Sequence, residues 1–206
     1  MPSYSIYSNY PSLILGFHGC EKSVGEKILN GKEVHLTPSQ NEYDWLGEGI
    51  YFWENNPTRA LDFAKYVKKY DDPFVIGAIL SLGHCLDLMD HSNLQLIHMS
   101  HSNLEKEFND AGKKLPKNMV SRTKSNKDKD PGRDKIFRYL DCAVIQNLHR
   151  INEKVNRGAR FQSVRGLFTE GNPIYEGAGF NQKNHIQLCI RESSCIKGYF
   201  RPIEDL

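Results

Sequence analysis

The sequence contains no apolar run that approaches the roughly 20 residues needed to cross a bilayer. Its first residues, 1–11, are rich in Tyr and Ser and have neither the basic region nor the apolar stretch of a signal peptide. The formal net charge of the 206 residues is only +2, too small by itself to indicate a nucleic-acid-binding protein. We therefore expect a cytoplasmic protein that does not bind membranes.

Disulfide and metal-site patterns are also missing. The five cysteines are an odd number, and they form neither a C-x-x-C pair nor the spacing of a zinc site. We therefore expect reduced, structural thiols. Four histidines cluster in the middle of the chain without a carboxylate-supported ligand pattern, so we expect no metal; they are His84, His91, His98 and His101.

No Pro-, Gly- or Ser-rich linker divides the chain, so residues 1–206 are expected to form a single domain with one core. Short apolar runs predict strands, and apolar residues at helical spacing predict helices. The expected strands span 12–18, 50–53, 74–82, 163–169, 185–191 and 196–200. The expected helices span 21–29, 58–69, 93–111 and 134–152.

Three short segments carry the functional argument: F-H-G at 17–19, G-E-G-I-Y-F at 47–52 and H-I-Q-L-C-I-R at 185–191. In this order they resemble the ADP-ribosyltransferase superfamily, in the branch of poly-ADP-ribose polymerases and diphtheria-type toxins. Its motif is a His, a Tyr and usually a Glu on three strands. The resemblance implies an α+β fold in which two packed, mainly antiparallel sheets form an NAD cleft, with helices outside.

The resemblance also assigns roles to individual residues. His18 matches the residue that hydrogen-bonds the adenosine ribose, and Gly19 the one whose backbone meets the nicotinamide amide, where a missing Cβ permits close approach. Tyr51 matches the aromatic on which the nicotinamide stacks, worth roughly 0.5 to 1.5 kcal/mol beyond burial. The alternative is that His18 and Tyr51 only fill the core. Further expected NAD-binding residues are Ser39, Gly49 and Phe52, with Asn41 as an additional loop contact.

Gln187 stands where the superfamily usually has a Glu. That Glu binds the nicotinamide-ribose hydroxyl and stabilises positive charge as the glycosidic bond breaks. A Gln keeps the hydrogen bond but not the charge, so we expect transfer of single ADP-ribose units rather than polymers. Three carboxylates near this strand are candidates to supply the missing charge or to act as a base: Glu170, Glu176 and Glu192.

Arginine and lysine suggest where phosphates would bind. A guanidinium can pair with two phosphate oxygens, which makes Arg59, Arg165 and Arg191 candidates for holding the NAD pyrophosphate. Segment 113–138 holds ten cations against three acids, and we call it the basic segment. Near an NAD cleft it would attract a nucleic-acid backbone. It could equally be a solvated loop or a binding site for an antitoxin.

These observations predict an NAD-dependent mono-ADP-ribosyltransferase with His18, Tyr51 and Gln187 as catalytic residues and NAD as a substrate. The expected acceptor is a nucleic acid, RNA in preference, and the next choice is a protein. The run D-W-L-G-E-G-I-Y-F-W-E followed by R-A-L-D-F-A also resembles small bacterial proteins suspected to be toxins of toxin–antitoxin or phage-defence modules, which implies an antitoxin partner. Two more functions are compatible with the sequence: a non-catalytic NAD- or ADP-ribose-binding module, and an antitoxin-type interaction protein.

Overall fold

The computed structural model describes residues 12–120, 135–155 and 160–203. Residues 1–11, on which the absence of a signal peptide was argued, lie outside the described residues. So do five of the ten cations of the basic segment, namely Arg122, Lys124, Lys127, Lys129 and Arg133.

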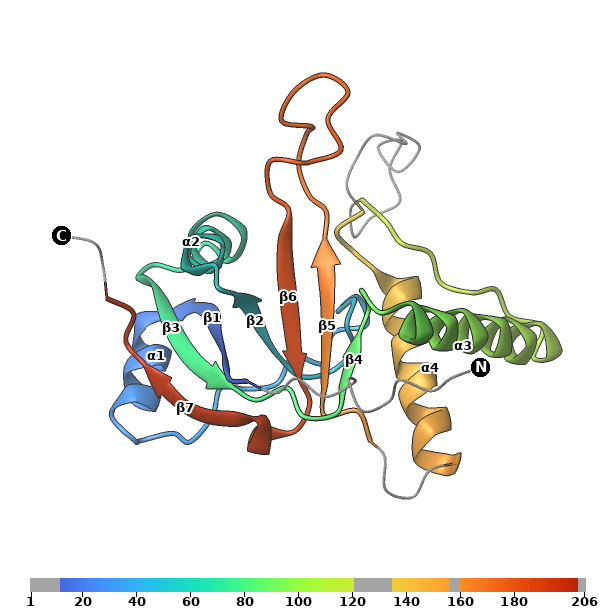
Figure 1. Cartoon of the computed structure of the whole chain (residues 1–206), viewed down its shortest axis with the longest axis horizontal. Helices are drawn as coiled ribbons and strands as arrows, with labels where there is room; N and C mark the ends of the chain where they lie inside the picture. Colours follow the sequence, from blue (N-terminus) through green and yellow to red (C-terminus); the bar gives the residue numbers. More distant parts are fainter. Residues whose placement is uncertain (1–11, 121–134, 156–159, 204–206) are drawn as a thin grey trace.

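The fold is mixed α+β, as predicted, and is built on a seven-stranded sheet in the order β4-β5-β6-β2-β1-β3-β7 (Figure 1). All neighbouring strands are antiparallel except the parallel pair β4–β5. The strands are β1 (Ile14–Glu21), β2 (Ile50–Glu54), β3 (Pro73–Leu80), β4 (Cys85–Asp87), β5 (Ser163–Phe168), β6 (His185–Ile190) and β7 (Ile196–Phe200). The α-helices of the described ranges are α1 (Lys22–Leu29), α2 (Pro57–Asp62), α3 (His91–Asp110) and α4 (Tyr139–Val155). A π-helical segment (Phe63–Lys68) continues α2, and a 3₁₀ turn (Ser193–Cys195) precedes β7.

The sheet is continuous, which corrects the prediction of two separate sheets. Strand β1 pairs with β3 along its full length, from Ile14 opposite Leu80 to Glu21 opposite Pro73. It pairs with β2 only where Gly16 and Phe17 face Glu54 and Trp53. This short ladder joins β1-β3-β7 to β2-β6-β5-β4. Beyond Phe17, strands β1 and β2 diverge.

Two details of the fold were not predicted. Helix α4 begins at Tyr139 rather than near 134, because the side-chain oxygen of Asn118 accepts hydrogen bonds from the first free backbone N–H groups of the helix, on Leu140 at 2.9 Å and Asp141 at 3.3 Å. Ile136, which lies inside the expected span 134–152, precedes the helix and is 48% exposed. Strand β4 was missed because three residues are too few to show a periodic pattern.

Successive residues of a strand point to opposite faces of the sheet, and this decides what reaches the site. On one face Ile50, Phe52 and Leu188 enter the largest core cluster, which α1 covers through Ile28. Tyr51 points to the other face, where it packs against a second core cluster that includes Ile145 and Leu148 of α4. All five cysteines are buried and form no disulfide. Within the described ranges, no helix is both long and apolar enough to span a membrane.

The buried His149 on α4 predicts a pH-dependent stability. Neither ring nitrogen has a hydrogen-bond partner, and burial, with Arg191 nearby, lowers its pKa to about 3. In the unfolded chain His149 takes up a proton near pH 6.5, whereas in the folded chain it does not. Protonation of His149 therefore has no effect on stability above pH 6.5 and destabilises the fold increasingly as the pH falls toward 3. We expect the free energy of unfolding to drop by about 2 kcal/mol more between pH 7 and 5 in the wild type than in His149→Leu.

Urea denaturation at several pH values measures this difference. The control is His98→Leu, because His98 is exposed on α3. Equal pH dependence in the wild type and His149→Leu would contradict the prediction.

Candidate functional site

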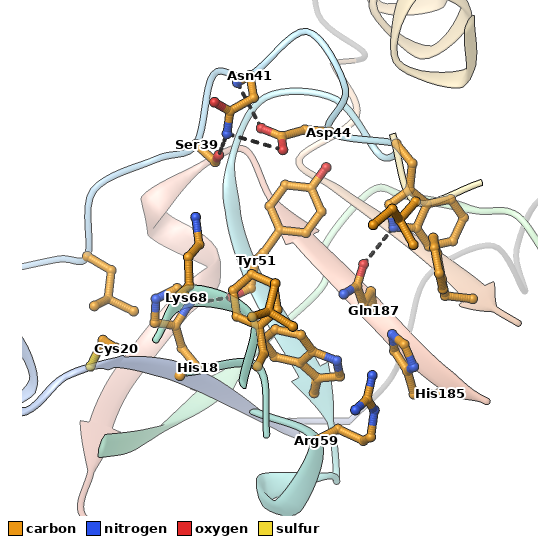
Figure 2. Close-up of a pocket in the computed structure, with 18 of the residues that line it drawn as sticks. His18, Cys20, Ser39, Asn41, Asp44, Tyr51, Arg59, Lys68, His185 and Gln187 are labelled. Atoms are coloured by element: carbon orange, nitrogen blue, oxygen red, sulfur yellow. Dashed lines mark hydrogen bonds between the residues drawn. The ribbon is translucent and has the colours of Figure 1, made fainter. Parts of the chain in front are cut away.

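A cleft of about 570 Å³ opens where β1 and β2 diverge. This volume lies within the range of small-molecule binding sites. Its floor is formed by β2 and β6, and its walls by the loop that precedes β2, the π-helical segment and the start of the β5–β6 connection. Figure 2 shows Tyr51 in the centre, with His18 and Gln187 on different sides of it.

Most of the predicted site residues meet in this cleft although they are far apart in the sequence. Its lining includes His18, Gly19, Ser39, Tyr51 and Gln187. Three residues that were named as possible assistants also line it, namely Asn41, Arg59 and Glu170.

Two predicted NAD contacts, Gly49 and Phe52, do not line the cleft. Phe52 is fully buried, since the side chain next to Tyr51 must point to the opposite face of β2. At Gly49 a Cβ atom would lie 2.6 Å from the Ile190 carbonyl oxygen, so this glycine lets β2 start close against β6. Both residues therefore shape the strand that carries Tyr51, and neither belongs to the lining of the cleft.

The fold brings only some of the charged candidates to the cleft. Arg165 is held 2.6 Å from Glu54 and 3.2 Å from Asp87, and Arg191 donates to the Phe161 carbonyl at 2.8 Å. Neither lines the cleft, because each serves a structural contact elsewhere, and Glu176 and Glu192 do not line it either. Arg59 and Glu170 are the candidates that remain.

Gly19 has a packing role that the sequence analysis did not predict. A Cβ atom there would lie 2.0 Å from the Ala60 carbonyl oxygen of α2. The missing side chain therefore allows α2 to pack directly on β1, whereas the prediction attributed it to the approach of a ligand.

His18 is fixed in one orientation by the neighbouring strand. Its Nδ1 lies 2.7 Å from the Tyr51 carbonyl oxygen, and since a carbonyl only accepts, Nδ1 carries the hydrogen. Burial lowers the pKa of His18, and the charge of Lys68 adds to this effect. The ring is therefore neutral near pH 7, and Nε2 is a hydrogen-bond acceptor.

Tyr51 is fixed through its hydroxyl group. The hydroxyl donates to the Gly47 carbonyl at 2.8 Å and accepts from the Leu46 N–H at 3.1 Å. Gly47 takes a positive φ of 84°, which few other residues adopt, and this closes the turn around the hydroxyl. Burial raises the pKa of Tyr51 well above its ordinary value, so the phenol stays neutral.

Gln187 is oriented by Trp45, a residue that the sequence analysis did not single out. The indole N–H donates to Oε1 of Gln187 over 2.6 Å. Because an indole is only a donor, the amide oxygen faces Trp45 and the amide NH₂ is available as a donor. Trp45 fits because Gly166 leaves room: a Cβ there would lie 2.6 Å from the indole ring. No local pattern indicated this contact across 142 positions.

At the α2 end of the cleft, several buried polar atoms have no hydrogen-bond partner. Arg59 lies 2.8 Å from Glu170 and 3.5 Å from Asp62, yet its Nε is unpaired. Trp53 Nε1 and His185 Nε2, also buried and in lining residues, have no hydrogen-bond partner either. Buried polar atoms without partners cost free energy, so this end has unused capacity for hydrogen bonds.

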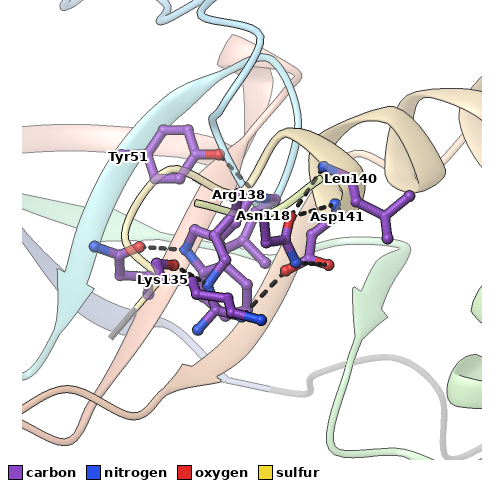
Figure 3. A network of polar contacts seen from close by, with 9 residues as sticks. Tyr51, Asn118, Lys135, Arg138, Leu140 and Asp141 are labelled. Atoms are coloured by element: carbon purple, nitrogen blue, oxygen red, sulfur yellow. Dashed lines mark hydrogen bonds and ion pairs between the residues drawn. The ribbon is translucent and has the colours of Figure 1, made fainter. Parts of the chain in front are cut away.

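The end of the basic segment borders the cleft. Ile136 lines it, and the Arg138 guanidinium lies 4.8 Å from the centre of the Phe168 ring, which also belongs to the lining. Figure 3 shows the polar network that holds this end, in which Asp141 binds Arg138 at 3.1 Å and Asn118 at 2.8 Å. Arg138 of the basic segment thus lies beside the cleft, with its charge paired to Asp141.

Among the described residues, no three His, Cys, Asp or Glu side chains come together in a way that could hold a metal ion.

Comparison with known sequences relates the chain to an archaeal protein. It is 47% identical over 204 residues to the uncharacterized protein MJ0359 of Methanocaldococcus jannaschii, an alignment that covers 88% of this chain and 83% of that protein. No protein-family model matches the chain.

Proposed function

We propose that this chain, which belongs to the family of the archaeal protein MJ0359, is an NAD-dependent mono-ADP-ribosyltransferase that modifies nucleic acid, RNA in preference, and releases nicotinamide. The observation that carries this proposal is the convergence of His18, Tyr51 and Gln187, from three strands, on one cleft. Each of the three is held by a hydrogen bond to the protein, which leaves a defined surface for a ligand.

The free groups of these residues match the chemistry of NAD. The neutral Nε2 of His18 can accept a hydrogen bond from a ribose hydroxyl, and the ring of Tyr51 offers a face for the nicotinamide. The NH₂ group of Gln187 can donate to an oxygen of the second ribose. Lys68, which also lines the cleft, supplies positive charge for the diphosphate, and the unpaired Nε of Arg59 can donate a hydrogen bond to it.

The architecture supports the same proposal. We assign the chain to the ADP-ribosyltransferase fold, with β1-β3-β7 and β2-β6-β5-β4 as its two halves. The cleft between the diverging strands β1 and β2 then corresponds to the NAD cleft.

In the proposed reaction the bond between ribose C1′ and the nicotinamide nitrogen breaks, and its electron pair leaves with nicotinamide. A hydroxyl or amine of the acceptor then bonds to C1′ and loses its proton. Because Gln187 carries no charge to direct further elongation, a single ADP-ribose unit is transferred.

The rim of the cleft favours a nucleic-acid acceptor. The exposed Lys135 adjoins Ile136, which lines the cleft, and a cation here would attract a phosphate backbone in a salt-dependent way. A transferase with such an acceptor would harm its own cell, so a toxin or defence role with a restraining antitoxin is part of the proposal. A protein acceptor is the second candidate, and a non-catalytic NAD-binding module the third.

The test is incubation of the purified chain with NAD labelled in its adenylate part and total cell RNA and protein, followed by separate digestion with ribonuclease and protease. We expect released nicotinamide and a labelled product that only ribonuclease destroys. Label destroyed only by protease would move the acceptor to protein. Absence of both label and nicotinamide would refute the transferase.

A further inference from the structure

Three carboxylates line the cleft, and they differ in how their charge is compensated. Glu170 lies 2.8 Å from Arg59 and 3.6 Å from Lys183, so two cations offset it. Glu21 accepts a hydrogen bond from the Asp72 N–H at the end of β1, where its charge acts on Cys20 and Tyr70. The third carboxylate, Asp44, has no ion-pair partner among the described residues.

Neutral groups alone hold the side chain of Asp44. Its two carboxylate oxygens accept from the backbone N–H of Asn41 at 2.9 Å and from the Asn41 side-chain amide at 3.4 Å. Hydrogen bonds from neutral amides fix the position of a carboxylate without cancelling its charge. The cleft therefore retains a negative charge at this loop.

The loop that precedes β2 links Asp44 through hydrogen bonds to the two catalytic candidates Tyr51 on β2 and Gln187 on β6. The next residue, Trp45, holds Gln187, and the backbone carbonyl of Asp44 accepts from Gly47 in the turn that binds the Tyr51 hydroxyl. Figure 2 shows Tyr51 between Asp44 and Gln187. The charge of Asp44 is felt on both strands, where it helps to raise the pKa of Tyr51 and of Cys189.

We propose that Asp44 is a further catalytic residue, whose carboxylate faces the nicotinamide riboside of bound NAD and stabilises the positive charge that develops there. This inference rests on the proposed function. As the C1′–N bond breaks, the positive charge of the nicotinamide ring passes to C1′ and the ring oxygen of the ribose, while the electron pair leaves with nicotinamide. A fixed negative charge in the cleft favours this redistribution, and Gln187, being neutral, cannot supply it.

The first test compares nicotinamide release from NAD by the wild type and Asp44→Asn. The substitution keeps the size of the side chain and removes its charge, so kcat/KM for nicotinamide release should fall about tenfold to a hundredfold. The matched control is Glu42→Gln, which removes a charge from the same loop outside the cleft and should behave like the wild type. In Asp44→Asn, an added Gln187→Glu should recover at least about tenfold, because a carboxylate returns to the cleft.

A binding test separates this inference from the proposed function. NADH has an uncharged nicotinamide ring, so the wild type should bind NAD about tenfold more tightly than NADH by calorimetry, and Asp44→Asn should bind both alike. If the wild type releases nicotinamide and Asp44→Asn matches it in rate and in this ratio, only the role of Asp44 is refuted. If the wild type binds NAD without turnover, the proposed transferase activity is refuted, and the ratio of NAD to NADH affinity still tests the role of the Asp44 charge. If the wild type does not bind NAD, the proposed function and the role of Asp44 are both refuted.

Discussion

Replacement of His18 by alanine is expected to lower nicotinamide release from NAD by about a hundredfold to a thousandfold. The substitution removes the fixed Nε2 acceptor from the cleft, and loss of one such contact in a preorganised site has effects of this size. The hydrogen bond from Nδ1 to the Tyr51 carbonyl is lost as well, which should cost about 1 kcal/mol of stability. Release of nicotinamide under NAD saturation, together with a thermal melt, measures both effects.

The control for this experiment is His98→Ala, since His98 is exposed on α3 and does not line the cleft. Tyr51→Ala should resemble His18→Ala, because it removes the ring face proposed for nicotinamide. If both variants turn over NAD at the wild-type rate while remaining folded, the cleft is not the NAD site and the proposed function is wrong.

The largest effect on stability is expected from Gly19→Ala. The added methyl group would stand 2.0 Å from the Ala60 carbonyl oxygen, which is rigid backbone of α2 and cannot rotate away. Helix α2 must then move off β1, and the buried Phe17, Trp53 and Ala60 would lose their mutual packing. We expect the free energy of unfolding to fall by about 4 kcal/mol.

Urea denaturation followed by circular dichroism checks this value. Gly179→Ala is the matched control, because a Cβ there meets no atom within 4 Å and should change stability by less than about 0.5 kcal/mol. A Gly19→Ala protein of wild-type stability that no longer binds NAD would instead favour the role predicted from the sequence, in which this glycine permits approach of the ligand.

The sequence by itself determined the elements that carry the site. Apolar runs of strand length around His18, Tyr51 and Gln187 predicted β1, β2 and β6, and all three strands are present. This succeeded because the length and apolar composition of a run are properties of neighbouring residues, which a local pattern records. The mixed α+β class followed in the same way.

Only the tertiary structure decided which charged and aromatic residues share the cleft. Local spacing offered Glu170, Glu176 and Glu192 equally, but the path of the β5–β6 connection brings only Glu170 to the lining. The fold also brings Trp45 to Gln187 and leaves Asp44 without a cation among the described residues. The joining of the two halves of the sheet at Gly16 and Phe17 was likewise beyond local patterns. Such contacts depend on how distant strands pair, and the free energy of pairing comes from packing and hydrogen bonds between segments whose separation in sequence carries no periodic signal.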